Sequence, residues 1–206
     1  MGLEYFWNLY VNPKQKLPFI GLVSEKKGTG KTTFLNFLKL LFQDNVSVVS
    51  SDDFKDRFND HFAHSLVLIS DEHTEGKERN KIAQKIKMFI TSEFIRAEKK
   101  FDSAYTTETF FKMIFAGNDE EILTVIEGEN TRYWIIKVES LKETDIHFLE
   151  KLKKEIPAFI YYLINDFKPR KSRGRLYFST KEFQSKAAEL IQENSKPKLQ
   201  KEIEAL

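Results

Sequence analysis

The chain has 206 residues, of which 41% are hydrophobic and 31% charged, and it contains no cysteine. This length suits one domain, or one domain with a small appendage, and the composition excludes a disordered or collagen-like chain. The lack of cysteine excludes disulfide scaffolds, thiolate zinc sites and cysteine nucleophiles, and it suits a reducing cytoplasm. The net charge is only +2, so any affinity for nucleic acid must come from local patches.

Hydrophobic residues are spread in short runs. None approaches the roughly 20 residues that span a bilayer, and the first residues lack the pattern of a signal peptide. We therefore expect a cytoplasmic protein with no membrane partner. Phenylalanine occurs 19 times, which predicts a Phe-rich core.

Apolar strands alternate along the chain with amphipathic helical patterns, which predicts an α/β fold with a parallel sheet. Short apolar or β-branched runs predict five strands, at residues 19–23, 46–49, 66–69, 113–116 and 133–138. Helical spacing of apolar residues predicts helices over residues 32–42, 52–63, 78–91 and 142–164.

A glycine- and lysine-rich stretch, Glu-Lys-Lys-Gly-Thr-Gly-Lys-Thr-Thr, follows the first expected strand and precedes the first helix of that pattern. This is the P-loop pattern, in which backbone N–H groups and the helix N-terminus cradle phosphates. We expect Lys31 to reach the β- and γ-phosphates of ATP and Thr32 to hold Mg²⁺. The alternative is an ordinary glycine turn between a strand and a helix. The expected nucleotide-binding residues are Gly28, Thr29, Gly30, Lys31, Thr32 and Thr33.

Glu25 stands where the P-loop pattern has its first glycine. Glutamate adopts a positive φ only at a cost, so the conformation of the first turn of the loop is an open question.

Two adjacent acids, Asp71 and Glu72, follow the apolar strand at 66–69. Neighbouring side chains on a strand point in opposite directions, so the two acids can have different roles. Beside a P-loop, the pair suits a Walker B strand, in which Asp71 holds Mg²⁺ and Glu72 polarises the attacking water. On its own, a strand that ends in Asp-Glu is as often structural.

The next strand ends in Gly117-Asn118, and Arg132 stands fourteen residues later, directly before the last expected strand. Asn118 could hydrogen-bond the lytic water or the γ-phosphate, as a sensor-1 residue does, or it could belong to a Gly-Asn turn. Arg132 could be a surface cation, or a finger that stabilises charge on the γ-phosphate of a neighbouring subunit, which is worth roughly 10³–10⁵ in rate.

Taken together, these motifs resemble the ATPase core of superfamily 3 helicases, in the group fused to primases in phages, plasmids and large DNA viruses. The resemblance runs from about residue 6 to residue 180. It rests on the P-loop, the Asp71-Glu72 strand, the Phe-Ala-Gly-Asn motif C that ends at Asn118, and the spacing to Arg132. The stretch from 86 to 100 is similar to motif B′ of that family. The resemblance implies an AAA+-like fold with sheet order 5-1-4-3-2.

The resemblance also implies a hairpin after motif B′ that carries basic residues to the DNA backbone within a ring pore. Residues 77–100 contain eight basic residues against three acids, and Phe101 and Tyr105 follow. Cations meet phosphates and aromatic rings stack on bases, so this composition suits single-stranded DNA. The alternative is a solvated helix face with a charged turn. The expected DNA-binding residues are Arg96, Lys99 and Lys100.

A second basic cluster contains five cations and no acid. It could sense the nucleotide from the lid side, contact DNA, or form a soluble loop. Its members are Lys168, Arg170, Lys171, Arg173 and Arg175.

We therefore predict a P-loop NTPase with an AAA+-like, parallel five-stranded sheet flanked by helices. Residues 1–140 would form the ATPase core and residues 141–206 a small helical, lid-like part with a basic loop. The predicted function is an ATP-driven ring helicase of phage, plasmid or viral DNA replication, acting in the host cytoplasm. Its expected partners are Mg²⁺, ATP, single-stranded or forked DNA, five further copies in a hexamer, and a primase or polymerase domain in the same or another polypeptide. The alternatives are a nucleotide-gated oligomerisation module without unwinding activity and a small-molecule kinase.

Overall fold

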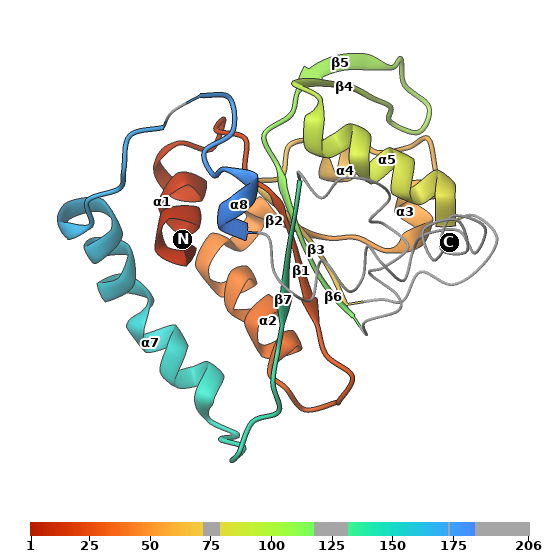
Figure 1. The fold of residues 1–206 in the computed structure, drawn as a ribbon. Helices are drawn as coiled ribbons and strands as arrows, with labels where there is room; N and C mark the ends of the chain where they lie inside the picture. The colour runs from red at the N-terminus through yellow and green to blue at the C-terminus, as the bar shows by residue number, and fades with distance from the viewer. Residues whose placement is uncertain (72–78, 118–131, 173, 184–206) are drawn as a thin grey trace, which may run out of the picture.

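A five-stranded parallel sheet forms the centre of the molecule, with helices on both of its faces (Figure 1). The computed structural model describes residues 1–71, 79–117, 132–172 and 174–183. The strands lie in the order β2-β3-β6-β1-β7, and every neighbouring pair is parallel. This order agrees with the expected 5-1-4-3-2 arrangement. The strands are β1 (Phe19–Val23), β2 (Val46–Val48), β3 (Val67–Ser70), β6 (Lys112–Gly117) and β7 (Tyr133–Lys137).

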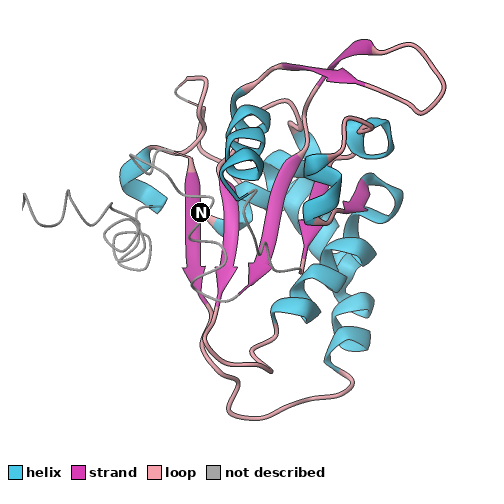
Figure 2. Ribbon diagram, turned by 90° about the vertical axis from the view of Figure 1, so that its right-hand side faces the viewer, coloured by secondary structure: helices cyan, strands magenta, loops and turns pink. Residues whose placement is uncertain are grey.

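The helices divide between the two faces of the sheet (Figures 1 and 2). Residues of α1, α2, α7 and α8 pack in one hydrophobic cluster, and residues of α3, α4 and α5 pack in the other. The helices are α1 (Gly2–Val11), α2 (Lys31–Phe42), α3 (Ser51–Lys55), α4 (Asp60–Ala63), α5 (Arg79–Thr91), α7 (Phe148–Tyr161) and α8 (Thr180–Phe183). A short 3₁₀ turn (Gln43–Asn45) follows α2, and a π-helical turn (Tyr162–Asp166) continues α7.

Alternate residues of each strand supply the two cores, as the pleat of a strand requires. On β1, for example, Phe19 and Val23 face the α3–α5 side, whereas Ile20 and Leu22 face the α1–α2 side. The central strands are buried on both faces, which is why they appear in the sequence as continuous apolar runs.

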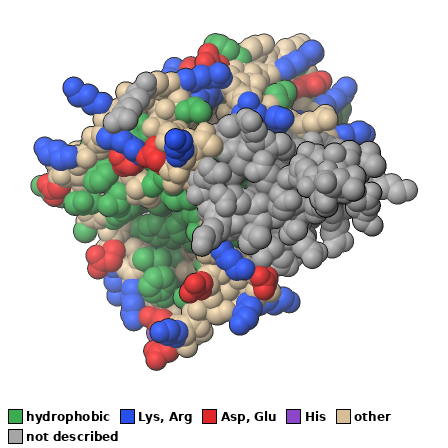
Figure 3. Space-filling model, viewed as in Figure 1, with side chains coloured by type: hydrophobic (Ala, Val, Ile, Leu, Met, Phe, Trp, Pro, Cys, Tyr) green, Lys and Arg blue, Asp and Glu red, His purple; other side chains and the backbone are tan. Residues whose placement is uncertain are grey.

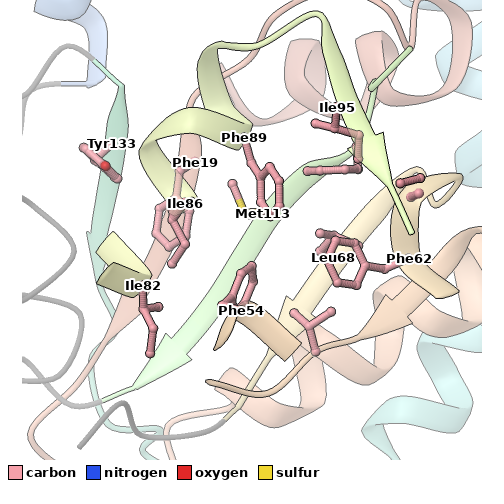
Figure 4. Packing of buried hydrophobic residues seen from close by; sticks show 14 of the residues in the cluster. Phe19, Phe54, Phe62, Leu68, Ile82, Ile86, Phe89, Ile95, Met113 and Tyr133 are labelled. Atoms are coloured by element: carbon pink, nitrogen blue, oxygen red, sulfur yellow. The ribbon is translucent and has the colours of Figure 1, made fainter. Parts of the chain in front are cut away.

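The core on the α3–α5 side is rich in phenylalanine, as the composition predicts (Figure 4). The rings of Phe54, Phe62 and Phe89 lie 6.0–6.2 Å apart between centroids. Phe89 also meets Phe111 edge to face at 5.5 Å. Such tilted and edge-on pairs suit the quadrupoles of aromatic rings, so these helices are held by more than burial alone.

The helix expected over residues 52–63 is instead two short helices, α3 and α4, separated by residues 56–59. The Asp56 side chain accepts a hydrogen bond from the Phe58 backbone N–H at 3.1 Å, a local turn that competes with helix. The helix expected from residue 142 begins only at Phe148, because Asp145 accepts from the His147 N–H in the same manner.

The spacing of apolar residues in the sequence did not predict two of the observed elements. One is α1, whose Tyr5 hydroxyl donates to the Pro18 carbonyl just before β1. The other is the antiparallel pair β4 (Phe94–Ala97) and β5 (Tyr105–Glu108), which matches the hairpin implied by the family resemblance. This β4–β5 hairpin stands at the end of the sheet opposite the loop between β1 and α2 (Figure 1).

The C-terminal part of the described chain returns to α1 and the start of β1. Lys16 and Leu176 form a parallel bridge, and Arg170 pairs with Glu4 and Glu182. The division at residue 140 into a core and a lid-like segment stays a prediction. Within the described ranges, no helix combines the length and the hydrophobicity needed to cross a bilayer.

Candidate functional site

The loop between β1 and α2 contains two glycines in the left-handed region. Gly28 has a φ of +71° and Gly30, which caps α2, has a φ of +88°. A residue with a side chain would be strained at either position, so the loop geometry requires these glycines. The loop therefore wraps around the N-terminus of α2, whose first N–H groups lack partners within the helix.

The departure at Glu25 causes no backbone strain. Among the described residues other than glycine, a positive φ occurs only at Gln43 and Phe101. The Glu25 carboxylate instead accepts a hydrogen bond from the Lys137 ammonium at 2.8 Å, at the end of β7. The loop thus begins without a left-handed residue and is tied to a neighbouring strand, which answers the question that the sequence left open.

A cavity of about 410 Å³ lies over this loop. Three lysines line it, together with backbone N–H groups at the start of α2, so it is suited to an anion with several negative charges. The Lys31 ammonium lies 3.4 Å from the Thr29 hydroxyl of the same loop. The residues that line the cavity are Lys26, Lys27, Gly28, Thr29, Gly30, Lys31, Thr32, Thr33, Asp71 and Gly117.

Thr32 and Asp71 meet in this cavity, although 39 residues separate them in the chain. The Thr32 hydroxyl donates to the Asp71 carboxylate at 2.7 Å, which links the first turn of α2 to the residue that follows β3. A hydroxyl and a carboxylate are hard oxygen ligands of the kind that Mg²⁺ takes along with water and phosphate oxygens. The described residues contain no cluster of three or more His, Asp or Glu with metal-binding geometry.

Two of the predicted catalytic residues, Glu72 and Asn118, lie outside the described residues, as does Arg173 of the second basic cluster. Each of the two directly follows a residue that lines the cavity, namely Asp71 and Gly117. Their roles stay predictions.

Arg132 is not part of this cavity. The Arg132 backbone carbonyl accepts a hydrogen bond from the N–H of Phe19, the first residue of β1. The glycine loop, in contrast, follows Val23, the last residue of β1. Because a strand rises about 3.3 Å per residue, roughly 16 Å of β1 separates the two. Arg132 therefore lies at the amino end of the sheet and the glycine loop at its carboxyl end.

The predicted DNA-binding residues gather on the β4–β5 hairpin. Arg96, Lys99 and Lys100 are all exposed. At the tip, Phe101 is 95% exposed and has a φ of +68°, and the Lys100 ammonium lies 5.2 Å from the centre of its ring. Lysine and arginine side chains are frequent along the upper edge of the space-filling view, where the hairpin lies (Figure 3).

A buried asparagine fixes the position of this hairpin. The Asn59 side chain donates to the Arg96 carbonyl at 3.0 Å and accepts from the Glu98 N–H at 2.9 Å. Tyr105 adds a hydrogen bond of 2.5 Å to Asp60, which raises the pKa of the Tyr105 hydroxyl. The hairpin is thus held at its sides while its tip stays exposed.

Three cations that the sequence analysis did not mark, or could not place, lie near the base of the hairpin. Lys112 is buried at the start of β6 and donates to the carbonyls of Pro13 and Phe110. Burial, together with a smaller effect of the positive charge of Lys16, lowers the pKa of Lys112 to about 7. Lys16 and Arg175 lie nearby, and only the fold brings the three together, so no local sequence signal could have revealed them.

The structure thus defines an α/β protein whose glycine loop forms a cationic cavity at the carboxyl edge of a parallel sheet. The chain belongs to the family of unknown function DUF5906, whose model matches residues 22–132, just over half of its length. The matched range begins within β1 and ends at Arg132, so it contains the cavity and the hairpin. The comparison with curated proteins found no match.

Solved structures with the same fold include two of the C-terminal region of NrS-1. The apo structure of its residues 305–718 has a TM-score of 0.80 at 20% identity, and the match covers 100% of this chain and 50% of that one. An A-form apo structure of the same region has a TM-score of 0.76 at 17% identity, and the match covers 95% of this chain and 47% of that one. The chain thus spans about half the length of these structures, and at such identities the similarity concerns the fold.

Proposed function

We propose that this protein is an ATPase of the superfamily 3 helicase type, with an AAA+-like P-loop fold, that translocates on DNA. The observation that carries the proposal is the hydrogen bond between Thr32 and Asp71 within the glycine-loop cavity. It joins the two residues that a P-loop and a Walker B strand must bring to one Mg²⁺ ion.

The glycine loop and Lys31 would hold the phosphates of ATP. The residues from Gly28 to Thr32 line the cavity, where their backbone N–H groups would bind phosphate oxygens and Lys31 would neutralise charge on the β- and γ-phosphates. Thr32 and Asp71 would hold Mg²⁺, which would supply neutralisation of phosphate charge. Phosphoryl transfer to water needs mostly positioning and neutralisation of charge, which this set of residues supplies.

Glu72 and Asn118 would act on the water. Glu72 follows Asp71, and Asn118 follows Gly117 at the end of the adjacent strand β6. In the proposal, Glu72 accepts a proton from the attacking water and Asn118 orients that water or the γ-phosphate. These roles are supported by the strand order, in which β6 lies between β1 and β3. The carboxyl end of β6 therefore lies between the glycine loop and Asp71.

Arg132 would act on the nucleotide of a neighbouring copy. Because roughly 16 Å of β1 separates Arg132 from the glycine loop of its own chain, a role of Arg132 at the γ-phosphate would have to be in trans. A head-to-tail contact closes into a ring when the rotation between neighbouring copies permits it, and we propose a hexamer. DNA would pass the tip of the hairpin, where Lys99 and Lys100 meet phosphates and Phe101 meets bases.

The assay that tests the proposal is ATP turnover with and without single-stranded DNA, combined with native mass measurement. A helicase-type motor hydrolyses ATP faster when DNA is present and assembles with an ATP analogue. Glu72→Gln should bind ATP and assemble but stall. Assembly without DNA-stimulated turnover would favour the oligomerisation module instead, and unimpaired turnover by Glu72→Gln would refute the assignment of the water-activating residue.

The trans role of Arg132 is tested by mixing subunits. Arg132→Ala subunits should reduce turnover of wild-type rings by more than their share of the mixture. A simple proportion between turnover and wild-type content would refute the role in trans.

A further inference from the structure

A second cationic hollow, of about 170 Å³, lies at the amino end of the sheet. Lys16, Arg132 and Arg175 all line it, and they come from the segment before β1, the residue before β7 and the C-terminal return of the chain. Arg132 has no ion-pair or side-chain hydrogen-bond partner within the described ranges. Three cations around one small hollow give it the net positive charge of an anion site.

The other two cations are engaged by neutral acceptors. The Lys16 ammonium donates to the Ser92 carbonyl and the Arg175 guanidinium to the Thr91 carbonyl, both at 2.6 Å. These carbonyls belong to the end of α5, where backbone acceptors lack helical partners and cations are favourable. A phosphate oxygen is a stronger acceptor for a charged donor than a neutral carbonyl, so an incoming phosphate would compete for both side chains.

The hollow has room for a single phosphate group. At about 30 Å³ per water molecule, it holds roughly five or six waters, which is too little for a whole nucleotide. Glu93 and Glu108 line the adjoining pocket beside Lys16 and Arg175. Their negative charge disfavours an extended polyanion such as a nucleic-acid backbone and leaves room for one localised phosphate.

We propose that Lys16 and Arg175 join Arg132 in a site for the terminal phosphate of a nucleotide held by a second copy of this chain. The inference rests on the proposed function and extends it by naming two further residues of the trans site. It follows from the same geometry, because the glycine loop of the same chain lies at the other end of β1.

Filling this site would act on the hairpin. Thr91 and Ser92 connect α5 to β4, and the Thr109 N–H donates to the Glu93 carbonyl on the other side of the hairpin base. When a phosphate draws Lys16 and Arg175 away, the end of α5 loses both of its cationic partners. The nucleotide state of one subunit is thereby coupled to the mobility of the DNA-binding hairpin of its neighbour.

The test compares the affinity of the full chain for a non-hydrolysable ATP analogue and for ADP, at protein concentrations above and below assembly. Arg175 is exposed, so Arg175→Ala is expected to fold, and its thermal unfolding checks this. In assembled protein, Arg175→Ala should lower the affinity for the analogue about 10- to 100-fold, as expected for loss of a charge-assisted hydrogen bond. The affinity for ADP should be unchanged. Lys16→Ala should behave in the same way.

Lys14→Ala is the matched control. Lys14 is exposed, pairs with Glu108 and does not line the hollow, so both affinities should stay at the wild-type values. Hydrogen exchange at residues 92–94 and 108–109 gives a second measurement: the analogue should raise it in assembled wild-type protein and not in Arg175→Ala.

Each other result has a distinct meaning. A wild-type chain that binds no ATP analogue refutes the proposed function itself. Wild-type binding that Arg175→Ala leaves unchanged, or that is independent of assembly, overturns the inference and leaves the ATPase proposal standing. If Arg175→Ala loses single-stranded DNA binding while its nucleotide affinity is unchanged, the hollow binds nucleic acid instead. If inorganic phosphate alone competes with the analogue, without any effect of assembly, the hollow binds a free ion instead.

Discussion

Replacement of Phe101 by glycine should make the protein more stable and, at the same time, a weaker DNA binder. Phe101 lies at the tip of the β4–β5 hairpin with a φ of +68° and 95% of its surface exposed. Its ring meets the Lys100 ammonium at 5.2 Å and buries almost nothing. A large aromatic residue in a left-handed conformation, without packing to offset the strain, is unfavourable for folding and points to a role in binding.

The magnitude follows from two opposing terms. A left-handed φ costs a non-glycine residue about 1–2 kcal/mol, which Phe101→Gly removes. Glycine also gives the unfolded chain more freedom, which takes back about 0.4–1 kcal/mol. The net expectation is a stabilisation of about 0.8 kcal/mol, from the midpoints of limits that differ by roughly 0–1.6 kcal/mol. If the ring stacks on one base, worth about 1–3 kcal/mol, affinity for single-stranded DNA should fall about 5- to 150-fold.

The assay pairs urea unfolding with anisotropy titration of a labelled single-stranded oligonucleotide. Phe101→Tyr is the matched control, because it keeps both the ring and the strain and should leave stability and affinity unchanged. Lys100→Ala should lower the log–log salt slope of binding by about 0.7, as expected for one lost contact to a single strand. Unchanged affinity in Phe101→Gly, or a loss of stability, would refute the reasoning.

Three further substitutions test other parts of the account. Thr32→Val keeps the side-chain volume but removes the donor to Asp71, so titrations should show weaker nucleotide binding with Mg²⁺ and unchanged binding without it. Gly30→Ala should lower the free energy of unfolding in urea by at least about 1 kcal/mol, because φ is +88°, although its Cβ would lie 3.8 Å from Leu141 without a clash. Above pH 7 the folded protein binds fewer protons at Lys112 than the unfolded chain does. The free energy of unfolding should therefore rise by up to about 1.4 kcal/mol per pH unit toward pH 10. Lys112→Met should remove most of this rise. An unaltered slope in Lys112→Met would contradict the assignment of this pKa.

The central strands β1, β3 and β6 were predictable because burial on both faces makes them nearly continuous apolar runs, and the outer strands β2 and β7 were predictable from their β-branched and aromatic residues. The glycine loop was predictable for a similar reason, since positive φ values at Gly28 and Gly30 need glycine and leave a visible sequence pattern. The meeting of Thr32 and Asp71 followed from the parallel topology, which brings the carboxyl ends of strands to one edge.

Other features depended on contacts distant in sequence. The Phe54–Phe62 stripe has helical spacing, but the side chain of Asp56 and the pairing of Asn59 with the hairpin interrupt the helix. The basic cluster at 168–175 also separates in space: Arg170 joins Glu4 and Glu182, whereas Arg175 enters the hollow with Arg132. No local pattern distinguishes the two arginines, because the difference arises where the chain returns to α1.

Glu25 shows the opposite case, in which a departure from a pattern has little structural effect. Its φ is not positive, and its side chain pairs with Lys137 on β7, a residue 112 positions away. The first position of the glycine loop therefore tolerates a side chain, and the strained positions are the later two glycines.

The most direct test of the account is calorimetric titration of the full chain with a non-hydrolysable ATP analogue in the presence of Mg²⁺. The account predicts binding by the wild-type chain, loss of binding by Lys31→Ala, and weaker, Mg²⁺-independent binding by Asp71→Asn. Equal binding by the wild-type chain and Lys31→Ala, or no binding by the wild-type chain, would contradict the assignment of the glycine-loop cavity as a nucleotide site.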